Sequence, residues 1–236
     1  MSAITSTSTS VNVRVVSFLD GARGATGHAV IVDVFRAFTT AAFCIAAGAR
    51  EVVLLADHEQ ALAMKKAESR LFLTGEIGGK PIPGFDAGNS PSVIEGMDLS
   101  GRRVVQRSSS GTQGVVAATR ADAILLGSLV TAAATARYLR DHATEVTLVA
   151  MGDGGTEPNA EDPACSAYLA SLLGGAPFDV RAAIAALPQW RNERWPAWFP
   201  RRDAELACEV DRFDFALPVA REDGLLVARA ARVSAG

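Results

Sequence analysis

Residues 28–56, HAVIVDVFRAFTTAAFCIAAGAREVVLLA, hold two strand patterns and the helix pattern between them. The apolar run 28–34 predicts a buried strand, the alanine-rich pattern from Arg36 to Ala47 predicts a helix, and the run 51–56 predicts a second buried strand. Two buried strands joined by a helix are typical of a parallel sheet. This stretch therefore predicts an α/β protein.

The same alternation continues on both sides of this stretch. Further strand-like runs are VNVRVVSFL, RLFLT, RRVVQ, DAILLG and EVTLVAM, and helical patterns cover Glu59–Glu68, Gly114–Arg120, Thr131–Asp141 and Pro163–Leu173. We expect Asp162 to cap the last helix, Pro163 to take its first position and Gly174 to end it. The pattern predicts a layered α/β/α fold with a largely parallel or mixed sheet, which two similar lobes would also satisfy.

Two segments differ in composition from this alternating part. Residues 1–10, MSAITSTSTS, are polar and predict a disordered tail, so we expect residues 11–236 to form a single α/β domain, with two closely packed lobes as the alternative. After residue 176 all three tryptophans fall within 190–198, beside several arginines. This segment predicts a helical cover over one sheet edge or a subunit contact, and hence a homodimer as one arrangement. The run 224–233 predicts a closing strand.

Composition excludes several classes of function. The 236 residues contain 23 basic and 26 acidic side chains, with no dense basic cluster, which argues against a nucleic-acid partner. The apolar runs are shorter than the roughly 18 residues that cross a membrane. Three widely spaced cysteines and three scattered histidines form neither a disulfide framework nor a zinc motif. We therefore expect a cytoplasmic protein in which any metal has oxygen ligands.

The segment GEIGGKPIPGFDAGNSP, residues 75–91, is too rich in turn formers to be helix or central strand. Loops of this kind on a rigid scaffold carry binding groups, although a simple Ω-like surface loop fits the composition as well. Four predicted strands end in the polar turns VDVFRAFTT, VQRSSSGTQG, LLGSLVT and VAMGDGGTEPNAED. Because ligands bind beyond the carboxyl ends of parallel strands, we expect these turns and the loop to line one pocket.

Two of these turns suit an anion. Ser108–Thr112 places hydroxyl and backbone N–H groups directly before a helical pattern, an arrangement that favours phosphate and that an ordinary helix cap explains equally well. For Ser128 the same features are fewer, and the residues alone favour the cap.

The acidic residues suit a magnesium ion. Asp33 ends an apolar strand and Arg36 follows it, so the pair predicts a Mg²⁺ ligand beside a phosphate-binding guanidinium. A local Asp–Arg pair or a helix cap is the alternative. Glu76 and Asp86 lie near the two ends of the glycine-rich loop. Asp153 and the pair 161–162 add a second acidic cluster, and Mg²⁺ prefers such oxygen donors.

Five segments occur in an order that resembles the 2-phosphosulfolactate phosphatase family: VDVFRAFTT, GEIGGKPIPGFDAGNSP, SSSGTQG, LLGSLV and EDPACSAYLASLL. The resemblance covers about residues 28–175. It implies a Mg²⁺-dependent hydrolase that converts 2-phosphosulfolactate, or a related phosphorylated hydroxy acid, to 3-sulfolactate and phosphate, a reaction linked to coenzyme M synthesis.

The resemblance also implies roles for particular residues. Metal ligands would be Asp33, Glu76 and Glu161, the first two also counting as catalytic. Asp86 or Asp153 would activate the attacking water. Phosphate and substrate would be held by Arg36, Asn89, Ser90, Ser109, Ser110, Gly111, Thr112 and Ser128.

The sequence departs from the family pattern at Ile77, where a basic residue is common, in the Ser108–Thr112 turn, where the pattern is Thr-Thr-Asn-Gly-Thr, and at Ala164–Cys165. The loss of a cation and an amide leaves a second reading, a relative that binds an anionic metabolite without turnover or with altered specificity. A third reading is a subunit-interaction protein that uses the tryptophan-rich segment.

Overall fold

The computed structural model describes residues 11–232, and strands in this range form one mixed sheet. One half contains the parallel strands β1 (Asn12–Ser17), β8 (Glu145–Ala150), β2 (His28–Val32) and β7 (Ala123–Gly127). The other half contains the parallel strands β3 (Glu51–Leu55), β6 (Arg103–Arg107) and β4 (Phe72–Ile77), with β5 (Lys80–Pro81) antiparallel at the edge. The predicted α/β class with a largely parallel, mixed sheet is confirmed.

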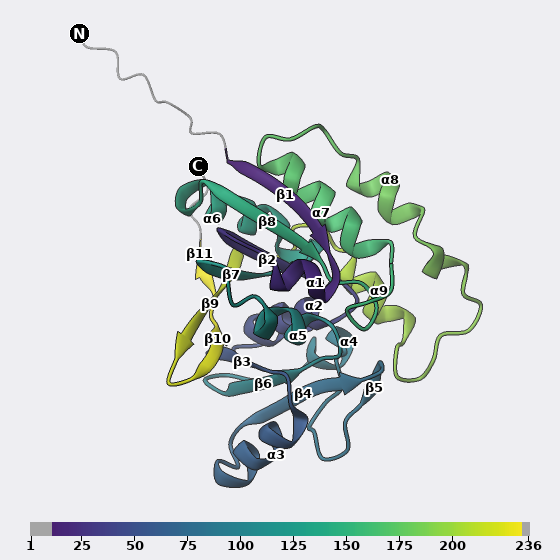
Figure 1. Cartoon of the computed structure of the whole chain (residues 1–236). Coiled ribbons are helices and arrows are strands. Elements are labelled where there is room, and N and C mark those ends of the chain that lie inside the picture. The colour runs from purple at the N-terminus through teal and green to yellow at the C-terminus, as the bar shows by residue number, and fades with distance from the viewer. Residues whose placement is uncertain (1–10, 233–236) are drawn as a thin grey trace.

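An antiparallel hairpin joins the two halves. Strand β9 (Phe215–Glu222) pairs with β7, β10 (Leu225–Ala228) pairs with β3, and β11 (Ala231–Arg232) returns to β9. Figure 1 shows this hairpin in yellow between the two groups of strands. The sequence predicted one closing strand here and missed β9, which contains Pro218. Proline normally argues against a central strand because it lacks an N–H.

Helices cover both faces of the sheet and include the five predicted before residue 176, whereas the short helices at 18–23 and 91–94 were not predicted. Helices α1 (Phe18–Arg23), α2 (Ala37–Ala46), α4 (Pro91–Ile94) and α5 (Gly111–Ala117) share one core with inward-facing residues of both half-sheets. On the outer faces lie α6 (Ala132–His142), α7 (Glu161–Leu172) and α8 (Val180–Ala185) against one half, and α3 (His58–Ala67) against the other. The single turns η1 (Leu129–Thr131) and η2 (Pro188–Arg191) and helix α9 (Arg201–Ala207) complete the described elements.

These layers arise because successive side chains along each strand pack on opposite faces of the sheet. In β2, Ile31 packs into the central core whereas Val30 and Val32 pack toward α6 and α7. In β3, Leu54 packs into the same central core whereas Val53 packs toward α3. Successive side chains of a strand point to opposite faces of the sheet. Since one face of both half-sheets contributes to the same core, the sheet must curve around the central helices. The division into one domain or two lobes remains a prediction, and the predicted tail 1–10 lies outside the described residues.

The start of α7 differs from the prediction. The helix begins at Glu161, and Asp162 does not cap it. Its carboxylate instead accepts hydrogen bonds from the backbone N–H groups of Val34, at 2.8 Å, and Gly152, at 2.9 Å. Asp162 therefore joins the loops that follow β2 and β8.

None of the helices between residues 11 and 232 is both long and apolar enough to cross a membrane.

Candidate functional site

A cavity of about 370 Å³ lies where β2, β4, β6 and β8 end. The hairpin reverses the direction of one half-sheet relative to the other, and in a flat sheet these ends would lie at opposite edges. Curvature brings them together, so residues that follow all four strands line the cavity. The predicted convergence is thus present for the glycine-rich loop and for three of the four polar turns, whereas no residue of the turn after β7 lines the cavity.

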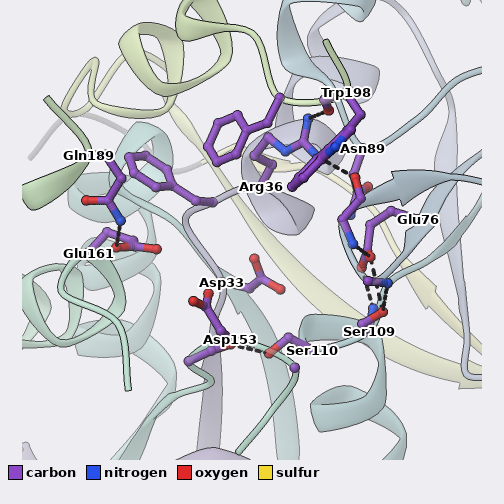
Figure 2. A pocket seen from close by; sticks show the side chains of 16 residues that line it. Asp33, Arg36, Glu76, Asn89, Ser109, Ser110, Asp153, Glu161, Gln189 and Trp198 are labelled. Carbon is purple, nitrogen blue, oxygen red and sulfur yellow. Dashed lines mark hydrogen bonds between the residues drawn. The ribbon is translucent and has the colours of Figure 1, made fainter. Parts of the chain in front are cut away.

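Asp33 lies in the middle of the cavity in the view of Figure 2. One carboxylate oxygen accepts from the N–H of Ala37, the first residue of α2, at 3.0 Å, and the other from the N–H of Gly111, the first residue of α5, at 2.7 Å. A Cβ on Gly111 would stand 2.7 Å from this second oxygen, so only glycine permits the approach. Burial, reinforced by the charge of Asp162, raises the pKa of Asp33 to about 8.

The glycine-rich loop forms one edge of the cavity through Glu76, Gly78, Gly79 and Asn89. The Glu76 carboxylate accepts from the Ser109 backbone N–H, from the Ser109 hydroxyl at 3.1 Å and from the Gly79 N–H at 2.6 Å. The Ser109 hydroxyl in turn accepts from Gly78 N–H at 3.0 Å. Glu76 therefore holds the loop against the Ser-rich turn.

Arg36 lines the cavity but does not pair with Asp33, which corrects the local-pair alternative. Its guanidinium donates to Asp203 at 2.8 Å, to the carbonyl of Trp198 at 2.6 Å and to the carbonyl of Gly79 at 3.1 Å. It also lies 4.4 Å from the ring centroid of Phe199. Arg36 thus connects the loop after β2 to the segment before α9 and to the glycine-rich loop.

The segment before α9 supplies one wall of the cavity, which the sequence reasoning did not predict. Gln189, Trp198 and Phe199 line it together with Phe35. A Cβ on Gly79, whose φ is +83°, would stand 2.5 Å from the Trp198 ring, so the ring packs directly on the glycine. The aromatic cluster in the sequence was the available signal, but it suited an edge cover or a subunit contact equally well.

Three more acids lie at or near the other side of the cavity. Glu161 and Asp153 line it, and Gln189 donates to Glu161 at 3.1 Å. Burial, together with the charge of Asp153, raises the pKa of Glu161 to about 7, and burial raises the pKa of Asp153. Burial and the charge of Glu161 raise the pKa of Asp162 to about 7.

Five residues predicted for the site do not line the cavity. Asp86 accepts from Lys65 at 2.7 Å and from the Leu73 N–H at 2.7 Å, so its carboxylate fastens the far part of the loop to β4 and α3. Ser90 donates to Asp203 at 2.8 Å. The side chains of Asp86 and Ser90 therefore bond to other parts of the protein and do not face the cavity.

The remaining three lie at helix starts. Thr112 exchanges hydrogen bonds with Ser108 at the first turn of α5, and Ser128 lies 3.4 Å from the Thr131 hydroxyl. Gly111 meets Asp33 rather than the cavity. Ser128 holds the N-cap position of η1, but its side chain makes no capping hydrogen bond, and Thr112 lies within the first turn of α5, so the structure confirms neither residue as a side-chain cap. Ser109 and Ser110 do line the cavity.

The predicted metal set of Asp33, Glu76 and Glu161 does not form one coordination group. Among residues 11–232, no three His, Cys, Asp or Glu side chains are placed to hold a metal ion together. Figure 2 shows why, because Glu76 and Glu161 lie on opposite sides of the cavity with Asp33 between them. Glu76 is also bonded to the loop that it holds.

Comparison with known proteins points to one family. A family model described as 2-phosphosulpholactate phosphatase matches residues 19–197. A probable 2-phosphosulfolactate phosphatase of Carboxydothermus hydrogenoformans is 38% identical over 61% of this chain and 59% of its own length. One from Gloeobacter violaceus is 36% identical over 67% of this chain and 68% of its own length. One from a Synechococcus species is 32% identical over 78% of this chain and 85% of its own length.

The match bears directly on the cavity. The matched residues 19–197 include all of its lining side chains apart from Trp198 and Phe199. Because the match spans most of the chain and contains most of this site, the chain belongs to the 2-phosphosulfolactate phosphatase family.

Proposed function

We propose that this protein is a Mg²⁺-dependent phosphatase that hydrolyses a small phosphorylated hydroxy acid, with 2-phosphosulfolactate as the first substrate to test. The observation that carries the proposal is the Asp33 carboxylate, buried in the cavity and fixed by the first N–H groups of two helices. The names of the relatives agree with it. The cavity is large enough for a three-carbon acid with two acidic substituents.

The charge balance of the cavity supports a divalent cation. Four carboxylates line it, those of Asp33, Glu76, Asp153 and Glu161, against the single guanidinium of Arg36. Arg36 is itself paired with Asp203. Once these carboxylates are ionised they would repel a phosphate monoester, so the ester then needs a cation to bind.

The absence of a three-carboxylate group does not conflict with magnesium. Mg²⁺ is commonly bound by one or two carboxylates, several waters and the substrate phosphate. Asp33 and Asp153 are the side chains that we assign to it, because both line the cavity and they follow the neighbouring strands β2 and β8. When bound, the ion neutralises charge on the transferred phosphoryl group.

The protein's own groups have separate tasks in this proposal. We assign the proton of the attacking water to Glu161, because its buried carboxylate lines the cavity on the opposite side from Glu76. The raised pKa that burial gives it without metal, about 7, is compatible with a general base. Ser109 and Ser110 bind the phosphate by turning their hydroxyls away from Glu76 and from the carbonyl of Gly152. Arg36 keeps Trp198 and Gly79 in place around it. Phosphoryl transfer depends mainly on such positioning and charge stabilisation.

The test is phosphate release from 2-phosphosulfolactate and from other phosphorylated hydroxy acids, in Mg²⁺ or in EDTA. Metal-dependent release from at least one ester supports the proposal. Binding of the esters to folded protein with no release from any of them would favour the non-catalytic relative instead.

The protein without metal should become less stable as the pH rises. The pKa is about 8 for Asp33 and about 7 for Glu161 in the folded protein, against ordinary values near 4. Between about pH 4 and pH 8 the folded protein therefore binds more protons than the unfolded chain, and the free energy of unfolding decreases with rising pH. Melting temperatures across this range in EDTA measure the effect.

Magnesium should oppose this loss, since it binds the ionised carboxylates. We expect Mg²⁺ to raise the melting temperature by several degrees at about pH 8 and much less at about pH 5. In Asp33→Asn the pH dependence in EDTA should flatten. A flat profile in the unmodified protein, or equal effects of Mg²⁺ at both pH values, would contradict the prediction.

We place the protein in the cytoplasm as part of this proposal. Cys44, Cys165 and Cys208 are all free thiols, which is typical of a reducing compartment. The homodimer predicted from the tryptophan-rich segment remains a prediction, and it is weakened because Trp198 faces the cavity.

A further inference from the structure

Gln106 lies on β6 directly beneath the cavity wall and is fully buried. Its amide nitrogen donates to the carbonyl oxygen of Ala37 at 2.7 Å and to the side-chain oxygen of Asn89 at 3.0 Å. Its own amide oxygen is buried without a hydrogen-bond partner. A buried, unpaired oxygen is costly, so the orientation of this amide needs an explanation.

The two contacts fix the orientation of both amides. A backbone carbonyl only accepts hydrogen bonds, so the end of Gln106 that meets Ala37 must be the NH₂ group. The same NH₂ group meets Asn89, and therefore the Asn89 atom that faces it must be the oxygen. Reversal of Gln106 would place its oxygen against two acceptors, and reversal of Asn89 would place two NH₂ donors against each other.

This arrangement leaves the NH₂ group of Asn89 for the cavity. Asn89 lines the cavity although only 2% of its surface is exposed, and no protein acceptor contacts its nitrogen among the described residues. A reversed Asn89 would instead present an acceptor beside the carboxylate-rich lining. The fixed orientation provides a neutral donor on a wall where acceptors dominate.

We infer that Gln106 is a positioning residue that holds Asn89 as a hydrogen-bond donor, and that the subsite beside Asn89 takes an acceptor-only acid group of the ligand. The inference rests on the proposed function for the nature of the ligand, an acid phosphate ester. Such a group has two sources in the substrate, its phosphate or one of its other acid groups, which we call the second acid. Both accept hydrogen bonds without donating them when they are fully ionised.

Gln106→Met tests the positioning, because methionine has a similar volume and cannot donate. With 2-phosphosulfolactate we expect KM to rise about 10-fold or more while kcat changes little, since a hydrogen bond to a charged group is lost. Asn89→Ala should give a similar rise, and the double variant no further rise, because both changes remove one interaction.

Gln113→Met is the matched control. Gln113 also donates through one amide nitrogen to two carbonyl oxygens, of Ala56 and Ser108, each at 3.0 Å, but it does not touch Asn89. We expect its KM to stay near that of the unmodified protein even if its melting temperature falls. Equal rises in Gln106→Met and Gln113→Met, or additive rises in the double variant, would overturn the inference.

A binding measurement separates this inference from the catalytic proposal and does not depend on the folding of a variant. The side-chain amide signals of Asn89 in ¹⁵N-labelled protein with Mg²⁺ are followed while inorganic phosphate or 3-sulfolactate is added. If phosphate shifts the signals and 3-sulfolactate does not, the subsite binds the phosphoryl group. If 3-sulfolactate shifts them and phosphate does not, it binds the second acid. Shifts in protein that hydrolyses no ester would retain the inference and reject the phosphatase, whereas unmoved signals with both acids would overturn it.

Discussion

Asp33→Asn should lower kcat for the preferred phosphate ester by about 10³-fold, the largest effect that we expect from a single substitution in the cavity. The change keeps the size of the side chain and removes its charge, so the cavity loses the carboxylate assigned to the cation. One of the two helix N–H groups, of Ala37 or Gly111, would then face an amide NH₂ group. Phosphate release under saturating Mg²⁺ gives kcat, and the melting temperature reports folding.

Asp86→Asn is the matched control for this prediction. Both residues are aspartates that accept backbone N–H groups, and both were predicted from the sequence to be catalytic. Asp86 is bonded to Lys65 and Leu73 outside the cavity, so its kcat should stay within about threefold of the unmodified protein. If Asp33→Asn keeps its activity, or if the two variants lose activity equally, the assignment of Asp33 is wrong.

Asp203→Ala should reduce the free energy of unfolding by about 3–5 kcal/mol, because it leaves the buried guanidinium of Arg36 without its partner. The side chain of Asp203 is fully buried and also accepts from Ser90 at 2.8 Å and from the Ser92 N–H at 3.0 Å. Its removal should loosen the wall that contains Trp198. Urea unfolding, followed by circular dichroism, measures the loss.

Two further variants make this prediction specific. Glu205→Ala, on the same helix α9, removes an exposed partner of Arg201 and should cost less than about 1 kcal/mol. Arg36→Met combined with Asp203→Ala removes both charges, so the double variant should be more stable than Asp203→Ala alone. If the double variant is instead less stable, packing and not the unpaired charge dominates the loss.

The sequence was informative about the fold wherever local pattern decides structure. The run 28–56 forms β2, α2 and β3 within a residue or two of the predicted limits. Strand β9 was missed because it takes Pro218 into the middle of a sheet, where long-range pairing with β7 overrides local preference. Asp162 was misplaced for a similar reason, since its partners Val34 and Gly152 are distant or lie outside its helix.

The site was predictable to the extent that polar residues follow strands. Asp33, Glu76, Ser109, Ser110 and Asp153 follow or end strands, and all of them line the cavity. The aromatic wall and the Arg36–Asp203 pair depend on how residues 186–203 fold back over the sheet, which no local pattern specifies. Gln106 lies inside a strand, and its role depends on an amide orientation that only the contacts reveal.

The central hairpin has a consequence for the order in which the chain can fold. Every strand that contributes to the cavity precedes β9 and β10 in the sequence. The ribosome therefore synthesises the strands of both half-sheets before the segment that joins them. Until residues 215–228 emerge, β7 and β3 each expose an unpaired edge, and such edges favour aggregation. We therefore expect newly made chains to depend on chaperones during this interval. In the finished molecule the hairpin pairs with both edges, so this need ends when residues 215–228 fold.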